Sequence, residues 1–387
     1  MTFKPLNEND IANTRTLLHE AVPLTGTIIS GTYGTFHQEN NIKNYSHGML
    51  QSVYDYPYLS SSANHIFDIT IGLSTAGELQ PLCTTTAAQA SKKKNIYNQM
   101  SQILMGYDQT GSIQLFDEDG DIIGGGVKIK DAIIVPMARL LSKDEIKKET
   151  FELKLGISGS KSGYDDPFGC IMTITDVSAS SEYRVNSPVG EYGILYATAS
   201  AAGAGAGGAL NASSEHTSSF NSNKYWYAGL LFYQAGVMVL TSSVFKQQLN
   251  ETAGGIADGT QGLVWGLNSE GALSDIVAGL TGSQISSSAD YFRHRIYNLQ
   301  FNNTTELNST IYFCRANHNE FNYSSNPTYL LNSKVRVKTI ASDNPVSYIT
   351  TIGLYNDNNE LLATAKLSEP LKKSPATEFT IRARLDY

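Results

Sequence analysis

Apolar and polar residues alternate in several segments of the chain, as they do in β-strands with one buried face. Phe67 to Leu73 and Phe151 to Ile157 show this alternation, and so do Lys334 to Lys338 and Phe379 to Tyr387. Side chains of a strand point in turn to its two faces, so each segment predicts a half-buried strand. One solvated face is typical of antiparallel sheets.

Polar turns between apolar runs predict β-hairpins. Asp117 to Asp121 and Asn356 to Glu360 are polar runs, each with a short apolar run on either side. The apolar segment Tyr225 to Phe245 is interrupted at Gln234-Ala-Gly236, which indicates two buried strands joined by a tight turn.

Helical patterns are few and short. Asp10 precedes an apolar pattern that Pro23 must end, so residues 10–21 are expected to form a helix. A second helix is expected over Ala88 to Met105, where apolar residues share one face. Ser142 and Glu145 have capping-box spacing and predict a third helix of one or two turns after them.

These elements predict a mainly β fold with a few short helices, built as antiparallel sandwich- or barrel-like domains with extended arms. We expect an N-terminal helix and arm over 1–60, a β-rich domain with short helices over 61–190, and a second β-rich domain over 191–387. Within the last, residues 197–209 are almost only Ala and Gly, so 197–224 is expected to be a flexible loop. Neither this loop nor the chain up to Tyr58 is expected to add much to a hydrophobic core.

Composition narrows the class of partner. Charged residues are 17% of the chain, against roughly 25% in typical domains, and the net formal charge is −8. An acidic balance argues against nucleic acid or anionic membrane as the partner. No basic leader precedes an apolar stretch and no apolar run reaches the length of a membrane span, so we expect a protein made in the cytoplasm without a transmembrane helix. Its three cysteines lie far apart, which predicts no disulfide framework.

Motifs that would carry chemistry are weak. Gly203 to Gly208 match G-x-G-x-x-G, but no helical pattern follows to hold a dinucleotide. Carboxylates alternate over Asp117 to Asp121 as in a calcium loop, but Ile122 and Lys128 occupy the positions of the required Gly and Glu, which favours a solvated turn. We therefore expect no catalytic residue, cofactor or metal, and no enzyme. A hydrolase with two carboxylates far apart in the sequence stays open.

Exposed aromatic residues are the candidates for interaction. Tyr54, Tyr56 and Tyr58 lie together on one short segment, and Trp226 and Trp265 are the tryptophans. Tyrosine suits interfaces because its ring buries area while its hydroxyl finds a polar partner. Ordinary packing beneath a loop is an equally good interpretation of the tyrosine cluster.

Several blocks of sequence resemble one class of protein. They are Asn41 to Met49, Val53 to Tyr58, Ala228 to Gly236, Tyr312 to Arg315, Asn319 to Asn322, and Ser325 to Pro327. Together they resemble virion structural proteins of tailed bacteriophages, particularly myovirus-type particles with contractile tails. Tyr348 to Tyr355 with Leu361 to Leu367 resembles a β-hairpin common in phage tail and baseplate proteins.

The resemblance implies a non-catalytic virion subunit, made in the host cytoplasm, that acts in tail or baseplate assembly or in attachment. Its partners would be other virion proteins and copies of itself. Two alternatives stay open: a neck or capsid-associated virion protein, and a receptor- or glycan-binding module that uses the exposed aromatic residues.

Overall fold

A computed structural model describes the chain in several stretches. These are residues 4–24, 39–75, 87–120, 128–158, 170–200, 217–220, 223–242, 285–324, 326–332, 334–336, 338 and 340–387. The chain forms two compact units. The first unit is Met1–Leu18 with Glu306–Tyr387, and the second unit is His19–Thr305. The boundaries expected near residues 60 and 190 both fall inside the second unit.

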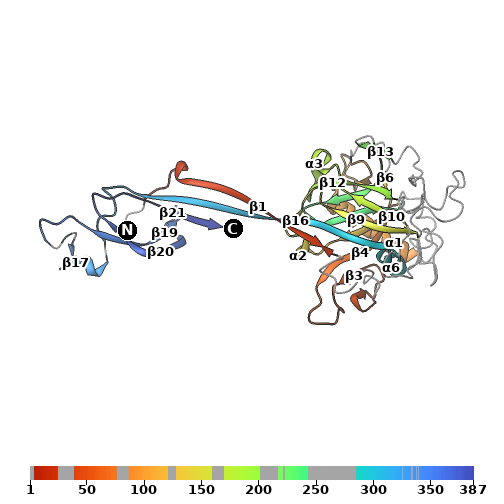
Figure 1. The fold of residues 1–387 in the computed structure, drawn as a ribbon, viewed down its shortest axis with the longest axis horizontal. Helices are drawn as coiled ribbons and strands as arrows, with labels where there is room; N and C mark the ends of the chain where they lie inside the picture. The colour runs from red at the N-terminus through yellow and green to blue at the C-terminus, as the bar shows by residue number, and fades with distance from the viewer. Residues whose placement is uncertain are drawn as a thin grey trace. The chain divides into compact units, whose positions relative to one another are not determined.

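One antiparallel sheet dominates the second unit (Figure 1). Its strands in spatial order are β16 (Ile296–Ala316), β9 (Glu152–Ser158), β10 (Cys170–Thr175), β12 (Gly190–Ser200), β14 (Asn223–Phe232), β15 (Val237–Thr241), β7 (Asp131–Pro136), β4 (His65–Leu73), β3 (Gln51–Tyr54) and β2 (Ile42–Asn44). The mainly β, antiparallel class is therefore confirmed.

Short strands and helices complete the second unit. The strands β8 (Glu145–Ile146), β11 (Arg184–Ser187) and β13 (Thr217–Phe220) add to β16, β12 and β14, while β5 (Phe116–Asp117) pairs with β6 (Lys128–Ile129). The helices are α1 (Ala87–Leu104), α2 (Arg139–Ser142), α3 (Ala179–Glu182) and α6 (Ser286–Arg295). The helix expected over 88–105 is confirmed as α1.

The central strands are covered on both faces. On β7, Ile133 belongs to one hydrophobic cluster and its neighbour Ile134 to another. Tyr97 of α1 packs in the second cluster, and a Cβ at Gly72 of β4 would lie 3.0 Å from the Tyr97 Cα, so helix and strand are in close contact. The strand expected at Phe67 to Leu73 is present, but it is buried on both faces rather than one, because α1 covers the face that alternation assigns to solvent.

Two expected helices are wrong. Residues 11–23 form the strand β1 (Ile11–Pro23), next to β16, and Leu17 and Leu18 are exposed instead of lining a helical core face. Pairing with a long strand overrides the local helical pattern here. Ser142 ends α2 rather than starting a helix, and Lys143 follows with a left-handed φ of 52°. The chain then enters β8.

Two segments that were expected to add little to a core, the chain up to Tyr58 and residues 197–224, do contribute buried residues. Ile42, Met49 and Val53 are buried in the first hydrophobic cluster, so the expectation for the chain up to Tyr58 is wrong over β2 and β3. Ala197 is also buried there, at the position on β12 where a loop was expected. Residues 201–216 of that loop lie outside the described residues.

The predicted hairpins have different outcomes. β14 and β15 pair with Phe232 opposite Val237, which confirms the turn at residues 234–236. The hairpin around 356–360 is also confirmed. Of the turn at residues 117–121, the structure describes the pairing of β5 with β6, while 121–127 lie outside the described residues.

The first unit contains the remaining strands (Figure 1). β21 (Phe379–Asp386) pairs antiparallel with the part of β16 from Ser309 to Ala316. β19 (Ser347–Tyr355) and β20 (Leu361–Lys373) form a separate two-stranded sheet, and β17 (Leu330–Leu331) pairs with β18 (Lys334–Val335). The strand expected at Phe379 to Tyr387 is confirmed.

Candidate functional site

The first unit has almost no hydrophobic core of its own. Among its described residues, the buried apolar side chains are Ile311, Ala316 and Ala383. The two large hydrophobic clusters are made of residues from the second unit. A domain is normally stabilised by burying one face of each sheet against another layer. The described residues of this unit supply no such layer.

The β19–β20 hairpin shows the lack of a covering hydrophobic layer most clearly. Apolar residues oppose each other across its two strands, as at Ile349 with Leu371, Ile352 with Ala365 and Leu354 with Ala363. Alternation along a strand predicts that such a face is buried. Every residue of this face is only half-buried. We call it the hairpin face: Ile349, Ile352, Leu354, Ala363, Ala365, Leu367 and Leu371.

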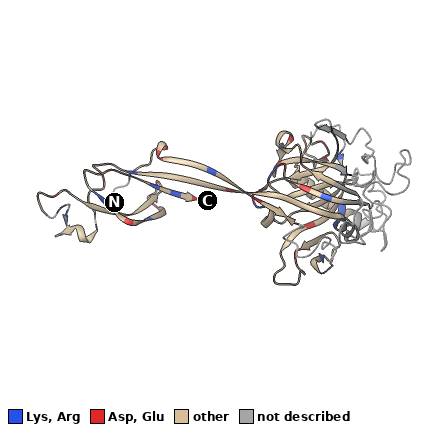
Figure 2. Cartoon of the chain, viewed as in Figure 1, with Lys and Arg blue, Asp and Glu red and all other residues tan. Residues whose placement is uncertain are grey.

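Other large apolar side chains of the first unit are exposed. They are Ile11, Leu17, Leu18, Leu307, Phe321, Tyr323, Leu330, Leu331, Ile340, Tyr348, Tyr355, Leu361, Leu362, Leu385 and Tyr387. β19 has no charged residue, while β20 has Lys366, Glu369, Lys372 and Lys373, none of them on the hairpin face. Figure 2 shows charges of both signs in this unit. Single exposed apolar residues are ordinary, but a concentration of them marks an interaction surface.

Ion pairs attach residues 4–18 to the rest of the first unit. Arg315 Nε lies 2.6 Å from Asp10 Oδ1, and Asp10 is buried. Lys4 Nζ lies 2.6 Å from Glu320 Oε2, and Arg15 pairs with Glu306. The Lys4 and Arg15 pairs are open to solvent, and such pairs contribute only about 0–1 kcal/mol each. They fix the position of this segment more than they stabilise it.

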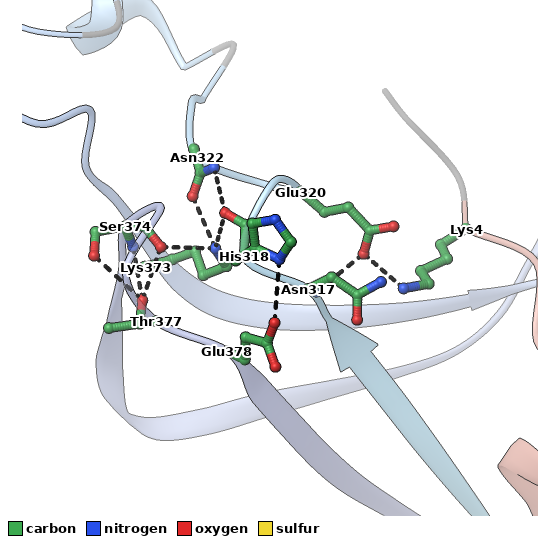
Figure 3. A network of polar contacts seen from close by, with 9 residues as sticks. All are labelled: Lys4, Asn317, His318, Glu320, Asn322, Lys373, Ser374, Thr377 and Glu378. Atoms are coloured by element: carbon green, nitrogen blue, oxygen red, sulfur yellow. Dashed lines mark hydrogen bonds and ion pairs between the residues drawn. The ribbon is translucent and has the colours of Figure 1, made fainter.

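A buried lysine organises the loops beside the hairpin (Figure 3). The Lys373 ammonium donates to the His318 carbonyl oxygen at 3.2 Å, to Asn322 Oδ1 at 2.8 Å and to the Ser374 carbonyl oxygen at 2.9 Å. Desolvation lowers the pKa of Lys373, while Glu378 and Glu320 act in the opposite sense. All three acceptors are neutral oxygens of the fold, and they use the three N–H donors of the ammonium, so Lys373 is a structural anchor.

His318 lies at the surface of the same network. Its Nδ1 is 3.2 Å from Glu378 Oε1, and both side chains are about two-thirds exposed, at 65% and 66%. A solvated pair of this type contributes little to the stability of the fold. Within the described part of the chain, no three His, Cys, Asp or Glu side chains gather as a metal site would require.

The sequence-predicted aromatic residues lie in the second unit. Tyr54 ends β3, with its ring centroid 6.2 Å from that of Tyr58 and 5.6 Å from that of His65. Tyr56 is 43% exposed and Tyr58 is 38% exposed. The structure thus brings the three tyrosines to one partly exposed segment. The Trp226 backbone lies in β14, but its side chain is outside the described part of the molecule, as is Trp265.

Two buried carboxylates in the second unit carry raised pKa values. Burial raises the pKa of Asp176 to about 6, and its oxygens accept hydrogen bonds from the Glu149 and Phe151 N–H groups at 2.8 and 3.1 Å and from the Tyr233 hydroxyl at 3.1 Å. These donors leave it a structural group that joins strands rather than an acid facing substrate.

Asp117 is the second such carboxylate. Burial raises its pKa to about 6, and its partner is Lys128. The turn expected to be solvated therefore begins with a fully buried side chain. The residue that stands where a calcium loop needs Glu supplies the neutralising cation. Sequence spacing favoured a solvated turn over a calcium loop and gave no sign of this ion pair. Asp117 follows Phe116 on β5, and Phe116 packs against Tyr97 and Phe232, a tertiary arrangement that local spacing does not reveal.

Sequence reasoning also missed Lys373. One signal was present: a lysine at the end of a strand, followed by Ser374-Pro375-Ala376-Thr377, where Ser374 N–H donates to Thr377 Oγ1 at 2.9 Å and closes a tight turn.

No helix in the described part of the molecule has the length and apolar character that crossing a membrane demands. Comparison of the chain with protein-family models, with curated proteins and with solved structures gives no match.

Proposed function

We propose that this chain is a non-catalytic structural subunit of a tailed-bacteriophage virion, acting in tail or baseplate assembly or in attachment. The observation that carries the structural role is the first unit, which keeps an apolar hairpin half-exposed and has three buried apolar side chains among its described residues. Such a unit gains stability when other chains cover it. The assignment to a phage particle rests on the sequence blocks from Asn41 to Pro327 and on the hairpin sequence.

Two buried ionisable groups among the described residues support the absence of catalysis in this proposal. Asp176 and Lys373 are each bonded to three partners within the fold. A general acid or base needs a free position facing substrate. Groups saturated by the fold itself hold strands and loops together instead.

The test is mass spectrometry of purified intact virions, isolated tails and tail-less heads from a phage that encodes the chain. The proposal expects the chain in intact virions and in tails. Absence from virions overturns the virion role. Presence on tail-less heads together with absence from tails replaces the tail placement with a neck or capsid position.

A receptor- or glycan-binding module is the second candidate, favoured by Tyr56, Tyr58 and Leu59, of which Leu59 is 84% exposed. Aromatic rings that stand free of the core suit stacking on sugars. Host cells and glycan arrays incubated with the isolated protein should bind it under this function. A Tyr56→Ala/Tyr58→Ala variant should then lose that binding, while Tyr183→Ala, at another exposed tyrosine, should retain it.

A further inference from the structure

We propose that the hairpin face is covered by the first units of other copies of this chain, so that the protein is a homo-oligomer assembled through its first unit. This rests on the proposed structural function and names its partner. The starting observation is the two-stranded sheet of β19 and β20, since an isolated two-stranded hairpin is at best marginally stable in water. The described residues of the first unit leave all seven side chains of its apolar face partly open to solvent.

The net charges of the two units favour another copy of this chain as the partner that covers the hairpin face. Residues 1–18 and 306–387 hold 11 Lys and Arg and 10 Asp and Glu, a net formal charge of +1. The whole chain carries −8, so the second unit carries −9. Copies can therefore meet through their first units without net repulsion, whereas their second units repel each other. A strongly basic partner would be attracted to the second unit, not to this one.

The distribution of charge within the first unit agrees with self-association. β19 has no charged residue, and the hairpin face contains none. Charges of both signs occur elsewhere on these strands: Lys366, Glu369, Lys372 and Lys373 on β20, and Arg382, Arg384 and Asp386 on β21. Interfaces usually have an apolar centre and polar surroundings, and a surface with charges of both signs can be complementary to its own copy.

The hairpin also presents strand edges. In the described part of the fold β19 and β20 pair with each other, and the sheet holds no third strand. An edge that pairs with the same edge of another copy would extend the sheet through main-chain hydrogen bonds, which depend little on side-chain identity. The apolar face itself would be covered by packing face to face against another copy.

The first experiment compares two single substitutions on adjacent positions of β19. Ile352→Glu places a carboxylate in the hairpin face, while Thr351→Glu places the same carboxylate on the exposed opposite face, across from Lys366. Mass is measured by light scattering after size exclusion over about 1 to 50 μM. Wild type and Thr351→Glu should run as a multiple of 42.1 kDa, and Ile352→Glu should dissociate at concentrations at least tenfold higher than wild type does.

A second variant protects the test against misfolding of the hairpin. Ser347 and Lys373 are opposite each other in the register, so residues 348–372 can be replaced by Asn-Gly, which closes a two-residue turn. This variant should be monomeric, with the thermal unfolding of the second unit unchanged. A monomeric wild type overturns the inference, and so does a hairpin-deleted chain that stays oligomeric. Neither result bears on the presence of the chain in virions, so this inference and the proposed function fail separately.

Discussion

The hydrogen bond between Tyr233 and Asp176 offers a test whose size depends on pH. Both side chains are buried, and the Tyr233 hydroxyl donates to Asp176 Oδ2 at 3.1 Å. Tyr233→Phe removes this donor and leaves the carboxyl with the two backbone N–H groups. A hydrogen bond to a charged group contributes about 1.5–3 kcal/mol, and one to a neutral group about 0.5–1.5 kcal/mol. The loss therefore depends on whether Asp176 is ionised.

The sign follows from the pKa of Asp176, which burial raises from 3.8 to about 6 in the folded state. Between these values the folded protein binds the proton and the unfolded chain does not, so this group makes stability fall as pH rises from about 4 to 6 and level off above. Removing a donor to the carboxylate raises the folded pKa further. We expect Tyr233→Phe to lower the free energy of unfolding by about 2 kcal/mol at pH 8 and by about 1 kcal/mol at pH 4.5.

Urea unfolding followed by circular dichroism at the two pH values measures both numbers. Tyr97→Phe is the matched control, because the Tyr97 hydroxyl donates to the Ile129 carbonyl and accepts from the Phe116 N–H at 3.3 Å, both neutral groups. Its loss should be the same at pH 8 and pH 4.5. An equal loss for Tyr233→Phe at the two pH values, or a larger loss at pH 4.5, would refute the reasoning.

Two further substitutions test packing in the second unit. Lys128→Met leaves Asp117 buried without its cation, so the free energy of unfolding should fall by about 3–5 kcal/mol at pH 8. The loss should be smaller near pH 5, where Asp117 is protonated. A loss in urea unfolding that is the same at both pH values would contradict this. A Cβ at residue 229 would clash with the Val239 carbonyl oxygen and would lie 2.9 Å from Leu240 Cα. Gly229→Ala should therefore lower the Tm by several degrees in a thermal unfolding experiment. An unchanged Tm would show that β14 and β15 can separate freely.

Local patterns were sufficient where the strand or helix is decided by its own residues. The hairpin of β19 and β20 and the helix α1 follow from alternation and helical spacing, and both are present. β1 could not be predicted, because its partner β16 lies some 290 residues away in the sequence and supplies the hydrogen bonds that favour a strand. Asp10, which was expected to begin a helix, instead forms a salt bridge with Arg315.

The candidate site was predictable only in outline. The alternation at Tyr348 to Tyr355 indicates an apolar face, but that face is conventionally assigned to a core, and nothing local shows that the core is missing. Lys373 is buried because loops around His318 and Asn322 close over it, and that closure is a tertiary event. The tyrosine cluster favours a site in the second unit, whereas among the described residues more of the exposed large apolar side chains are in the first unit.

The first unit is formed by two segments that lie far apart in the sequence, so it cannot be completed until the second segment has been synthesised. Residues 4–18 leave the ribosome early, but the strand that β21 pairs with, and β21 itself, follow after residue 306. At roughly 5–20 residues per second, synthesis of the intervening chain takes on the order of 15 to 60 s. During that interval the second unit can fold, while the surface that other copies would recognise does not yet exist. If copies assemble through the first unit as proposed, nascent chains on one polysome would thereby be kept from joining before their synthesis is finished.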